Sequence, residues 1–276
     1  MTVHFNNLKI PIALTIAGSD SGGGAGIQAD LKTFAFHQVH GTSALTCITA
    51  QNTMGVTRVD ALPVEAVMAQ LGAVMDDMGV QGVKTGMLLN QSIIKGVAQQ
   101  ISILKLYPLV VDPVMVSRTG DRLIDDEAIA ALYRELIPQA TLVTPNRYEA
   151  QLLSGITIET LADMETAAQR IQTCGVKAVL VKGGAMKGDL KGTDILWDGE
   201  ERLTLRTSIV DTPNTHGTGC TLSAAIAANL ALGYNLNQSV QQGKEYVTQA
   251  LRHSLNIGKG QGPVGHFYPL KNLNAM

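Results

Sequence analysis

Cysteine and aromatic residues are scarce in this sequence of 276 residues. Its three cysteines, Cys47, Cys174 and Cys220, are an odd number and include no C-x-x-C pair. Neither a disulfide framework nor a zinc site is therefore predicted. Aromatic residues make up only 4% of the chain, whereas glycine occurs 28 times. This balance favours a fold built on tight turns and close backbone approach.

Runs of positive charge and long apolar stretches are also missing. The net charge at pH 7 is -2, from 21 Lys and Arg against 23 Asp and Glu, and the absence of basic clusters argues against nucleic acid or an anionic membrane as partner. No apolar run approaches the roughly 18 residues that a membrane-spanning helix needs. The N-terminus lacks the basic start and apolar core of a signal peptide. We expect a cytoplasmic protein whose partner is a small molecule.

Strand-like and helical segments alternate along the chain. Compact apolar runs such as 12–17 and 178–182 are typical of buried parallel strands, and amphipathic stretches such as 63–78 predict helices between them. Repeated strand and helix units predict an α/β fold with a mostly parallel central sheet and right-handed crossovers. The length suits one large domain with helices on both faces of the sheet. We place this domain at 12–270, after a leader at 1–11.

Polar residues follow the predicted strands with unusual regularity. The carboxyl ends of parallel strands meet at one edge of a sheet, and ligands gather there. We therefore expect these side chains to form one site. They are Asp20, Gln51, Asp112, Asn146 with Glu149, and Lys182.

The stretch from Asp211 to Gly233, D-T-P-N-T-H-G-T-G-C-T-L-S-A-A-I-A-A-N-L-A-L-G, joins a polar turn to a helix of small residues. Gly217 and Gly219 let the backbone turn closely, and the first N–H groups of the helix are left unpaired at the positive end of its dipole. Such a helix start binds phosphate. Cys220 lies in this first turn, where a lowered thiol pKa is expected. The alternative is an ordinary loop above a buried thiol.

A second glycine-rich loop, Gly18 to Gly26, lies between a predicted strand and helix. Its glycines do not match G-x-G-x-x-G, and no G-x-x-x-x-G-K-[ST] occurs in the chain. The loop either permits close packing or lets a ligand approach the backbone. The number of glycines favours the second interpretation because it exceeds what a turn requires.

The residues at the strand ends suit phosphoryl transfer. This reaction needs a phosphate cradle, a divalent cation and a positive side chain, since catalysis is mostly positioning and charge stabilisation. The Gly217 to Cys220 turn supplies a cradle. Asp112 and Glu149 are hard oxygen ligands suited to Mg²⁺. Lys182 can neutralise phosphate oxygens.

Several long motifs occur in an order that resembles the hydroxymethylpyrimidine/phosphomethylpyrimidine kinases of thiamine biosynthesis, which belong to the ribokinase-like superfamily. The resemblance spans residues 12 to 267, including the ending G-P-V-G-H-F. The motifs are T-I-A-G-S-D-S-G-G-G-A-G-I-Q-A-D-L-K-T, A-Q-N-T, V-D-P-V-M, T-P-N-x-x-E-A, V-K-G-G and N-T-H-G-T-G-C-T-L-S-A-A.

The resemblance implies a ribokinase-like three-layer α/β/α sandwich and a homodimer. It also implies that ATP and Mg²⁺ serve to phosphorylate 4-amino-5-hydroxymethyl-2-methylpyrimidine, and then its monophosphate to the diphosphate. The residues carried over to the substrate pocket are Gln51, which would read the pyrimidine edge, and Ala25, Asp30 and Met87, which would line or support it. Those carried over to the nucleotide are Asn146, Glu149 and Lys182, with Asp112 and Glu149 at the metal. The anion hole corresponds to Gly217, Thr218, Gly219 and Cys220.

Many ribokinase-like enzymes carry an Asp base where this chain has Cys220. We expect Cys220 to accept the proton of the substrate hydroxyl, so that Cys220→Ala lowers turnover by about 100-fold or more. Nearby phosphates oppose a second negative charge on the sulfur. The loop Ser117 to Arg122 matches a mobile segment of the family and is expected to act as a flap that excludes water.

Three alternatives remain from the sequence. A pyridoxal or pyridoxine kinase would use the same scaffold, and one glutamine at position 51 does not settle selectivity. A non-catalytic protein that binds a nucleotide or another small ligand would need no base. A thiol hydrolase based on His216 and Cys220 is disfavoured because the two residues lie in one turn.

Overall fold

In the computed structural model, which describes residues 10–116 and 122–273, the strands form one nine-stranded sheet. Their spatial order is β3-β2-β1-β4-β5-β6-β7-β8-β9. The six neighbouring strands β2, β1, β4, β5, β6 and β7 run parallel to one another, whereas β3 pairs antiparallel with β2 at one end, and β8 with β7 and β9 with β8 at the other. The predicted mostly parallel sheet is confirmed. The strands are β1 (Ile12–Asp20), β2 (His40–Asn52), β3 (Gly55–Ala61), β4 (Gly82–Thr85), β5 (Leu109–Val111), β6 (Leu142–Val143), β7 (Val179–Val181), β8 (Thr193–Trp197) and β9 (Arg202–Arg206).

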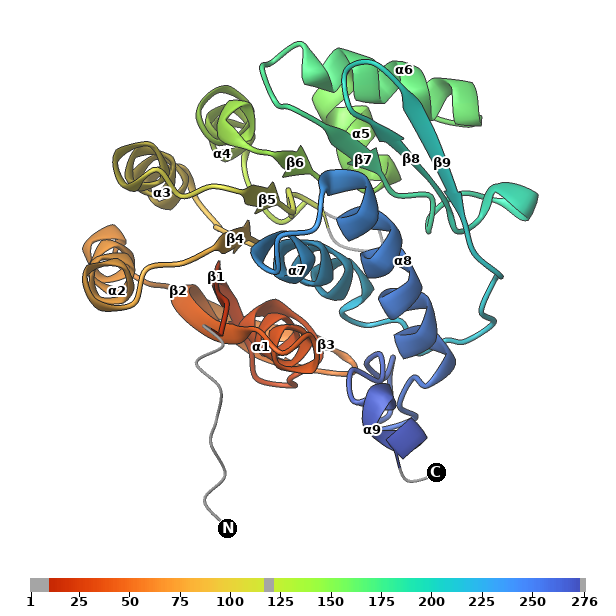
Figure 1. The fold of residues 1–276 in the computed structure, drawn as a ribbon, viewed down its shortest axis with the longest axis horizontal. Coiled ribbons are helices and arrows are strands. Elements are labelled where there is room, and N and C mark those ends of the chain that lie inside the picture. Colours follow the sequence, from red (N-terminus) through yellow and green to blue (C-terminus); the bar gives the residue numbers. More distant parts are fainter. Residues whose placement is uncertain (1–9, 117–121, 274–276) are drawn as a thin grey trace.

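Helices cover both faces of the sheet and give three layers (Figure 1). One face carries α2 (Val64–Asp77), α3 (Gln91–Leu104), α4 (Asp126–Ala131), α5 (Arg147–Ser154) and α6 (Leu161–Gln172). The other carries α1 (Gly26–Phe36), α7 (Thr218–Ala231) and α8 (Leu236–Arg252), and α9 (Tyr268–Leu273) follows near the C-terminus. The fold is therefore the predicted α/β/α sandwich.

Two apolar cores result from the alternation of side chains along the strands. Leu14 and Ile16 of β1 pack into the core under α2 to α6, whereas Ala13 packs into the core under α1, α7 and α8. Strand β5 repeats the pattern, with Leu109 on the first side and Val110 on the second. Each buried Leu or Ile side chain contributes about 1.5–3 kcal/mol, so the two cores hold the three layers together.

Helix boundaries follow side-chain caps. Asn146 begins α5 with a capping box in which Glu149 is the reciprocal partner, and Thr160 with Asp163 begins α6 in the same way. Gly155 ends α5 in the left-handed conformation that glycine adopts readily.

Some elements differ from the sequence prediction. Strand β3 and helix α9 were not predicted, because neither has a long apolar run. Helix α4 continues into a π-helical turn at Leu132–Leu136 and a 3-10 turn at Ile137–Gln139. Strand β8 lies between β7 and β9, and β9 ends the sheet.

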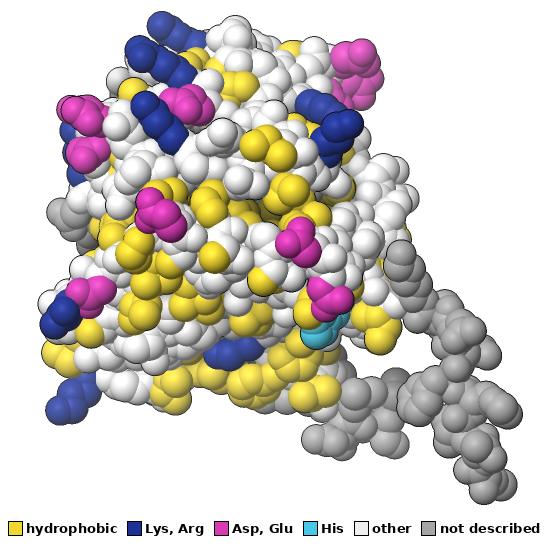
Figure 2. All heavy atoms as spheres, turned by 90° about the vertical axis from the view of Figure 1, so that its left-hand side faces the viewer, with side chains coloured by type: hydrophobic (Ala, Val, Ile, Leu, Met, Phe, Trp, Pro, Cys, Tyr) yellow, Lys and Arg dark blue, Asp and Glu magenta, His cyan; other side chains and the backbone are white. Residues whose placement is uncertain are grey.

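Charges of both signs are interspersed with apolar side chains on the face that carries α2, α3 and α4 (Figure 2). No block of basic residues is visible on this face, in keeping with the balanced composition. Within residues 10–116 and 122–273, none of the helices is both long and apolar enough to cross a bilayer.

Candidate active site

The fold brings the predicted strand-end residues together. Lys182, just after β7, donates to Oδ1 of Asp112, just after β5, over 2.9 Å. Asn146, after β6, forms a parallel bridge with Lys182. At the other half of this edge, Asp20 at the end of β1 and Gln51 near the end of β2 both approach His216. The edge is continuous because β1, β4, β5, β6 and β7 are neighbours in the sheet.

The start of α7, the turn Gly217 to Cys220 that is called the cradle below, leaves backbone amides unpaired. Gly217 caps the helix at φ +81°, without a side-chain hydrogen bond to the first turn. The N–H groups of Thr218 and Thr221 donate to the carbonyls of Thr215 and Gly217, over 3.3 and 2.9 Å. Among the described residues, the N–H groups of Gly219 and Cys220 have no such acceptor. Two amides at the positive end of the helix are thus free for an anion.

The two glycine loops pack against each other at this cradle. A Cβ on Gly217 would lie 1.7 Å from the carbonyl oxygen of Gly24, so only glycine fits there. A Cβ on Gly219 would instead lie 3.4 Å from Nζ of Lys182 and 3.7 Å from Oδ2 of Asp112. Gly219 therefore lies next to both the lysine and the carboxylate, and a side chain there would contact them. A phosphoryl group bound to the two free amides would be close to Lys182.

Asp20 organises the first glycine loop. Its carboxylate accepts hydrogen bonds from the N–H groups of Gly22, Gly24 and Ala25 over 2.8, 3.0 and 2.8 Å. Burial works to raise its pKa, but the hydrogen bonds from His216 and the backbone outweigh burial and hold the pKa below its ordinary value. These hydrogen bonds to Asp20 fix the conformation of the loop up to Ala25, the residue directly before α1.

His216 joins Gln51 to this loop. Its Nε2 lies 2.8 Å from Oδ2 of Asp20 and 3.4 Å from the amide nitrogen of Gln51. The hydroxyl of Thr49 lies 3.2 Å from the amide oxygen of Gln51. The Gln51 carboxamide is thus held beside His216, which precedes Cys220 by four residues in the turn at the start of α7. Sequence reasoning considered His216 only as a partner of Cys220 and missed its contact with Asp20.

Met87 and Asp30 lie at different depths. The ε-carbon of Met87 would be 3.1 Å from a Cβ on Gly18, which places this side chain against the end of β1. The Asp30 side chain has no exposed surface. It accepts from Nζ of Lys84 over 2.8 Å and from the hydroxyl of Thr15 over 2.6 Å. Asp30 is therefore enclosed by its partners and has no surface with which to contact a ligand directly.

Lys84 is a functional candidate that sequence reasoning missed. It is fully buried in β4 and paired with Asp30. Burial works to lower its pKa, but the Asp30, Cys220 and Asp112 groups outweigh burial and raise it, so Lys84 stays charged. A lysine within the short strand G-V-K-T was the available signal, because a buried lysine requires a nearby carboxylate.

Asp112 and Glu149 are two buried carboxyls close to one cation. Burial opposes ionisation of Asp112, but Lys182 and Lys84 outweigh it and hold its pKa below the ordinary value. Ser223 of α7 also donates to Oδ2 of Asp112 over 3.2 Å. Burial and the neighbouring Asp112 raise the pKa of Glu149 to about 8. Two like charges in one pocket explain why the second is hard to ionise.

The prediction of a lowered Cys220 pKa is wrong for the free protein. Burial raises the pKa of this thiol to about 11, and the positive charge of Lys84 offsets burial only in part. Asp30 and Asp112 raise the pKa further. The backbone N–H of Gly26 works in the opposite direction and lowers the pKa, but only slightly. The helix start favours the thiolate, but loss of water outweighs that effect.

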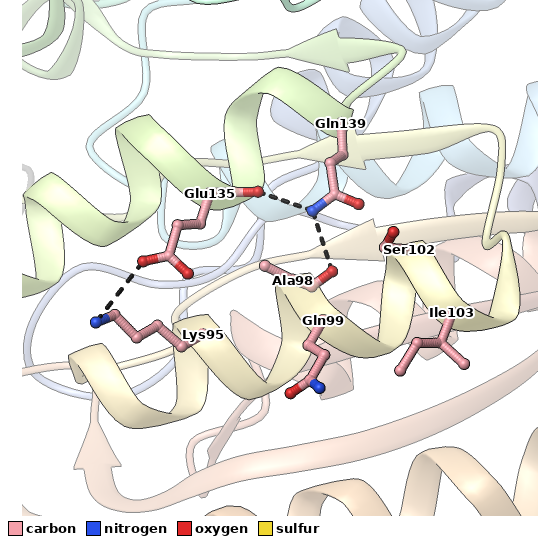
Figure 3. Close-up of a pocket in the computed structure, with 7 residues that line it drawn as sticks. All are labelled: Lys95, Ala98, Gln99, Ser102, Ile103, Glu135 and Gln139. Atoms are coloured by element: carbon pink, nitrogen blue, oxygen red, sulfur yellow. Dashed lines mark hydrogen bonds and ion pairs between the residues drawn. The ribbon is translucent and has the colours of Figure 1, made fainter.

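Two further features lie apart from the strand-end residues and the start of α7. The expected flap falls on residues 117–121, which lie outside the described residues, although Val116 and Arg122 on either side form an antiparallel bridge. A hollow of about 550 Å³ lies between α3 and the turn at Leu132–Leu136 and is lined by Lys95, Ala98, Gln99, Ser102, Ile103, Glu135 and Gln139 (Figure 3). It contains none of the strand-end residues.

Comparison with known proteins places the chain in a family. A family model described as phosphomethylpyrimidine kinase matches residues 20–265. A protein of Synechococcus elongatus named hydroxymethylpyrimidine/phosphomethylpyrimidine kinase is 62% identical over 263 residues, which are 95% of this chain and 100% of that protein.

Solved structures agree with this placement. A Bacillus subtilis pyridoxal kinase in an ADP complex superposes with a TM-score of 0.88 at 41% identity, covering 94% of this chain and 98% of that one. A phosphomethylpyrimidine kinase of Clostridium difficile gives a TM-score of 0.79 at 42% identity, covering 88% and 100%. The fold is thus ribokinase-like, and this chain belongs to the phosphomethylpyrimidine kinase family.

Proposed function

We propose that this protein uses ATP to phosphorylate 4-amino-5-hydroxymethyl-2-methylpyrimidine and then phosphorylates the monophosphate to the diphosphate, in thiamine biosynthesis. One observation supports this proposal above the others. Gly219, whose amide is free like that of Cys220, lies beside the Lys182–Asp112 ion pair, and Gln51 contacts His216 in the turn that begins the same helix. A phosphate cradle beside a carboxamide suits transfer to an aminopyrimidine alcohol.

We expect separate groups of residues to bind the pyrimidine, the nucleotide and the transferred phosphoryl group. Gln51 offers one donor and one acceptor, which match the ring nitrogen and amino group of the aminopyrimidine. Ala25 and Met87 would contact the ring, and Asp30 would support them through Lys84. On the nucleotide side, the roles fall to Asn146, Glu149 and Lys182. The anion hole would be Gly217, Thr218, Gly219 and Cys220.

The experiment that tests the proposal measures ADP release with three phosphoryl acceptors, namely the hydroxymethylpyrimidine, its monophosphate and pyridoxine. We expect kcat/KM for the hydroxymethylpyrimidine and for its monophosphate to exceed that for pyridoxine by at least about tenfold. Higher kcat/KM with pyridoxine would favour a pyridoxal kinase, which the similarity to pyridoxal kinase structures makes the second candidate. No ADP release above background with any of the three would favour a non-catalytic ligand-binding protein.

Mg²⁺ would be held by Asp112 and Glu149. Within the described residues, no three His, Cys, Asp or Glu side chains are arranged as a metal site, but Mg²⁺ keeps several waters and uses only one or two carboxylates. The raised pKa of Glu149 beside Asp112 indicates a like-charge conflict that a cation would relieve. When bound there, Mg²⁺ supplies charge neutralisation of phosphate oxygens.

Mg²⁺ binding is expected to depend on pH through Glu149. Its pKa of about 8 is raised, so the carboxyl is mostly protonated at neutral pH and must lose its proton before it binds a cation. Affinity should therefore rise by up to about tenfold per pH unit below pH 8 and level off above it. Titration calorimetry in two buffers of different ionisation enthalpy measures both the affinity and the released proton.

Glu149→Gln is the matched control for this titration. Glutamine also completes a capping box, so α5 should keep its first turn. The variant should bind Mg²⁺ more weakly, with an affinity that no longer changes near pH 8. An unchanged pH dependence in Glu149→Gln would remove Glu149 from the metal site.

The raised thiol pKa changes what is expected of Cys220. With a pKa of about 11, the thiolate fraction at pH 7 is about 10⁻⁴. General base catalysis raises a reaction rate by about 10²–10⁴-fold. Because so little of Cys220 is thiolate at pH 7, this gain is cancelled at that pH. We expect Cys220→Ala to lower kcat by only about tenfold at pH 7 but by at least about 100-fold near pH 10.

Steady-state kinetics from pH 7 to 10 on both proteins check this expectation. The ratio of the two kcat values should grow with pH if the thiolate is the base. A constant ratio would mean that Cys220 only orients the hydroxyl. A 100-fold loss already at pH 7 would mean that the thiol pKa in the complex with substrates is much lower than in the free protein.

A further inference from the structure

His216 lies between a carboxylate and a carboxamide, beside the start of α7. Its Nε2 lies 2.8 Å from Oδ2 of Asp20 and 3.4 Å from the amide nitrogen of Gln51. Asp20 is an acceptor here, because its carboxylate already receives three backbone N–H groups and its pKa lies below the ordinary value. The proton between Asp20 and His216 therefore belongs to Nε2, which needs an acceptor, not a donor, from Gln51.

The ring of His216 is held in this direction by its surroundings. Its backbone N–H donates to the carbonyl of Gly262, and its own carbonyl accepts from the N–H of Val264, both over 3.2 Å. A Cβ on Gly24 would lie 2.3 Å from Cδ2 of His216, so the ring packs directly against the first glycine loop. The donor at Nε2 is therefore fixed.

Thr49 makes the opposite demand on the same carboxamide. Its hydroxyl lies 2.8 Å from the carbonyl oxygen of Ser19 and 3.2 Å from the amide oxygen of Gln51. A hydroxyl has one hydrogen, which goes to the closer carbonyl, so only its lone pairs remain for Gln51. Thr49 is buried, so water does not relax this requirement. Thr49 thus needs a donor from Gln51.

A half turn of the carboxamide satisfies both neighbours. The oxygen and nitrogen of Gln51 exchange places when the last side-chain bond rotates, and their partners decide which orientation is favoured. After the exchange, the amide oxygen accepts from Nε2 of His216 and the amide nitrogen donates to the hydroxyl oxygen of Thr49. The backbone of Gln51 stays in place, because its N–H and C=O are both bonded to the hydroxyl of Ser21, over 2.8 and 2.7 Å.

We propose that His216 and Thr49 are positioning residues that fix the direction in which Gln51 reads the substrate, with the amide oxygen toward His216 and the amide nitrogen toward Thr49. This inference rests on the proposed function. In the hydroxymethylpyrimidine, the carbon with the amino group lies between the ring nitrogen and the carbon with the hydroxymethyl group. The amino group then donates to the amide oxygen, and the hydroxymethyl group extends past His216 toward the cradle. The opposite direction of Gln51 would turn the ring over and hold the hydroxymethyl group on the Thr49 side, away from α7.

An analogue with its donor and acceptor exchanged tests this direction. The compound 5-hydroxymethyl-2-methylpyrimidin-4-one carries a ring N–H and a carbonyl in place of the ring nitrogen and the amino group. It pairs with Gln51 only when the ring is turned over, so its kcat should suffer more than its KM. We expect kcat/KM for the amine to exceed that for the pyrimidinone by at least about 100-fold. His216→Leu and Thr49→Val should each reduce this ratio to about tenfold or less, because the carboxamide then turns freely.

Each variant has a matched control that keeps the hydrogen bond. His216→Gln retains an N–H donor beside Asp20, and Thr49→Ser retains the hydroxyl, so both should keep the ratio of the unmodified protein. Thermal melting confirms that all four variants are folded. In a Gln51→Leu background, His216→Leu should change the ratio by less than about twofold, since its effect passes through Gln51. Unchanged ratios in His216→Leu and Thr49→Val, or an equal effect of His216→Leu with and without Gln51, would overturn the proposal.

A second measurement needs no substrate. The side-chain N–H protons of Gln51 can be identified by NMR from their loss in Gln51→Leu. Nuclear Overhauser contacts between these protons and Thr49 would support the proposal, whereas contacts with the ring of His216 would overturn it. Absence of ADP release with the amine would contradict the proposed function but not the orientation of Gln51. ADP release together with contacts to the His216 ring would contradict the orientation alone.

Discussion

Gly219→Ala is expected to fold at least as well as the unmodified protein and to lose at least about 1,000-fold in kcat/KM for ATP. The added Cβ meets nothing closer than Nζ of Lys182 at 3.4 Å and Oδ2 of Asp112 at 3.7 Å, so the free protein accommodates it. Alanine in the first turn of α7 should also raise the free energy of unfolding by up to about 1 kcal/mol. The methyl group, however, fills the space between the free amides and Lys182, where a phosphoryl group would bind.

Gly217→Ala is the contrasting variant. Its Cβ would lie 1.7 Å from the carbonyl of Gly24, and its φ of +81° is strained for alanine. This variant should therefore lose both stability and activity, and its melting temperature should fall. Thermal melting and ATP kinetics on both variants separate a blocked cradle from a broken turn. Full activity in Gly219→Ala would show that the amides at the start of α7 do not hold phosphate.

The sequence predicted those parts of the site that local rules determine. The spacing of Gly217 and Gly219 before a run of small residues predicts the turn and the helix, and both occur. Alternating strands and helices place Asp112 and Lys182 at one edge, and the two side chains form an ion pair over 2.9 Å. These predictions succeed because parallel strands leave no choice about which ends meet.

The predictions that failed depend on how deeply a side chain is buried and on which way it points. The helix start predicts a lowered pKa for Cys220, but its sulfur lies inside the protein near Asp30 and Asp112, where loss of water dominates. Periodicity does not reveal which way that thiol points. Strand β3 was missed because its residues are exposed on both sides and therefore carry no apolar pattern. Lys84 could have been found, since a lysine among apolar strand residues already indicates a buried ion pair.

Lys182→Met is expected to lower kcat/KM for ATP by about 1,000-fold, because it removes the positive charge beside the cradle. It also leaves Asp112 buried without its partner, which should cost about 3–5 kcal/mol of the free energy of unfolding. In the unmodified protein Lys182 helps to hold the pKa of Asp112 below its ordinary value, so this stabilisation is present at neutral pH and lost as pH falls. Without Lys182, burial should raise that pKa instead. The difference in melting temperature between the two proteins should therefore grow from about pH 4 to pH 7.

The double variant Lys182→Met with Asp112→Asn separates the structural effect from the catalytic one. Neutralising both partners removes the unpaired buried charge, so thermal stability should largely return and its dependence on pH should weaken. Activity should not return, because both the positive charge and one carboxylate of the proposed metal pair are gone. If the double variant recovered activity together with stability, Lys182 would act only as the structural partner of Asp112. If Lys182→Met alone kept its kcat/KM for ATP while its stability fell, the nucleotide phosphates would have to bind elsewhere along the strand ends.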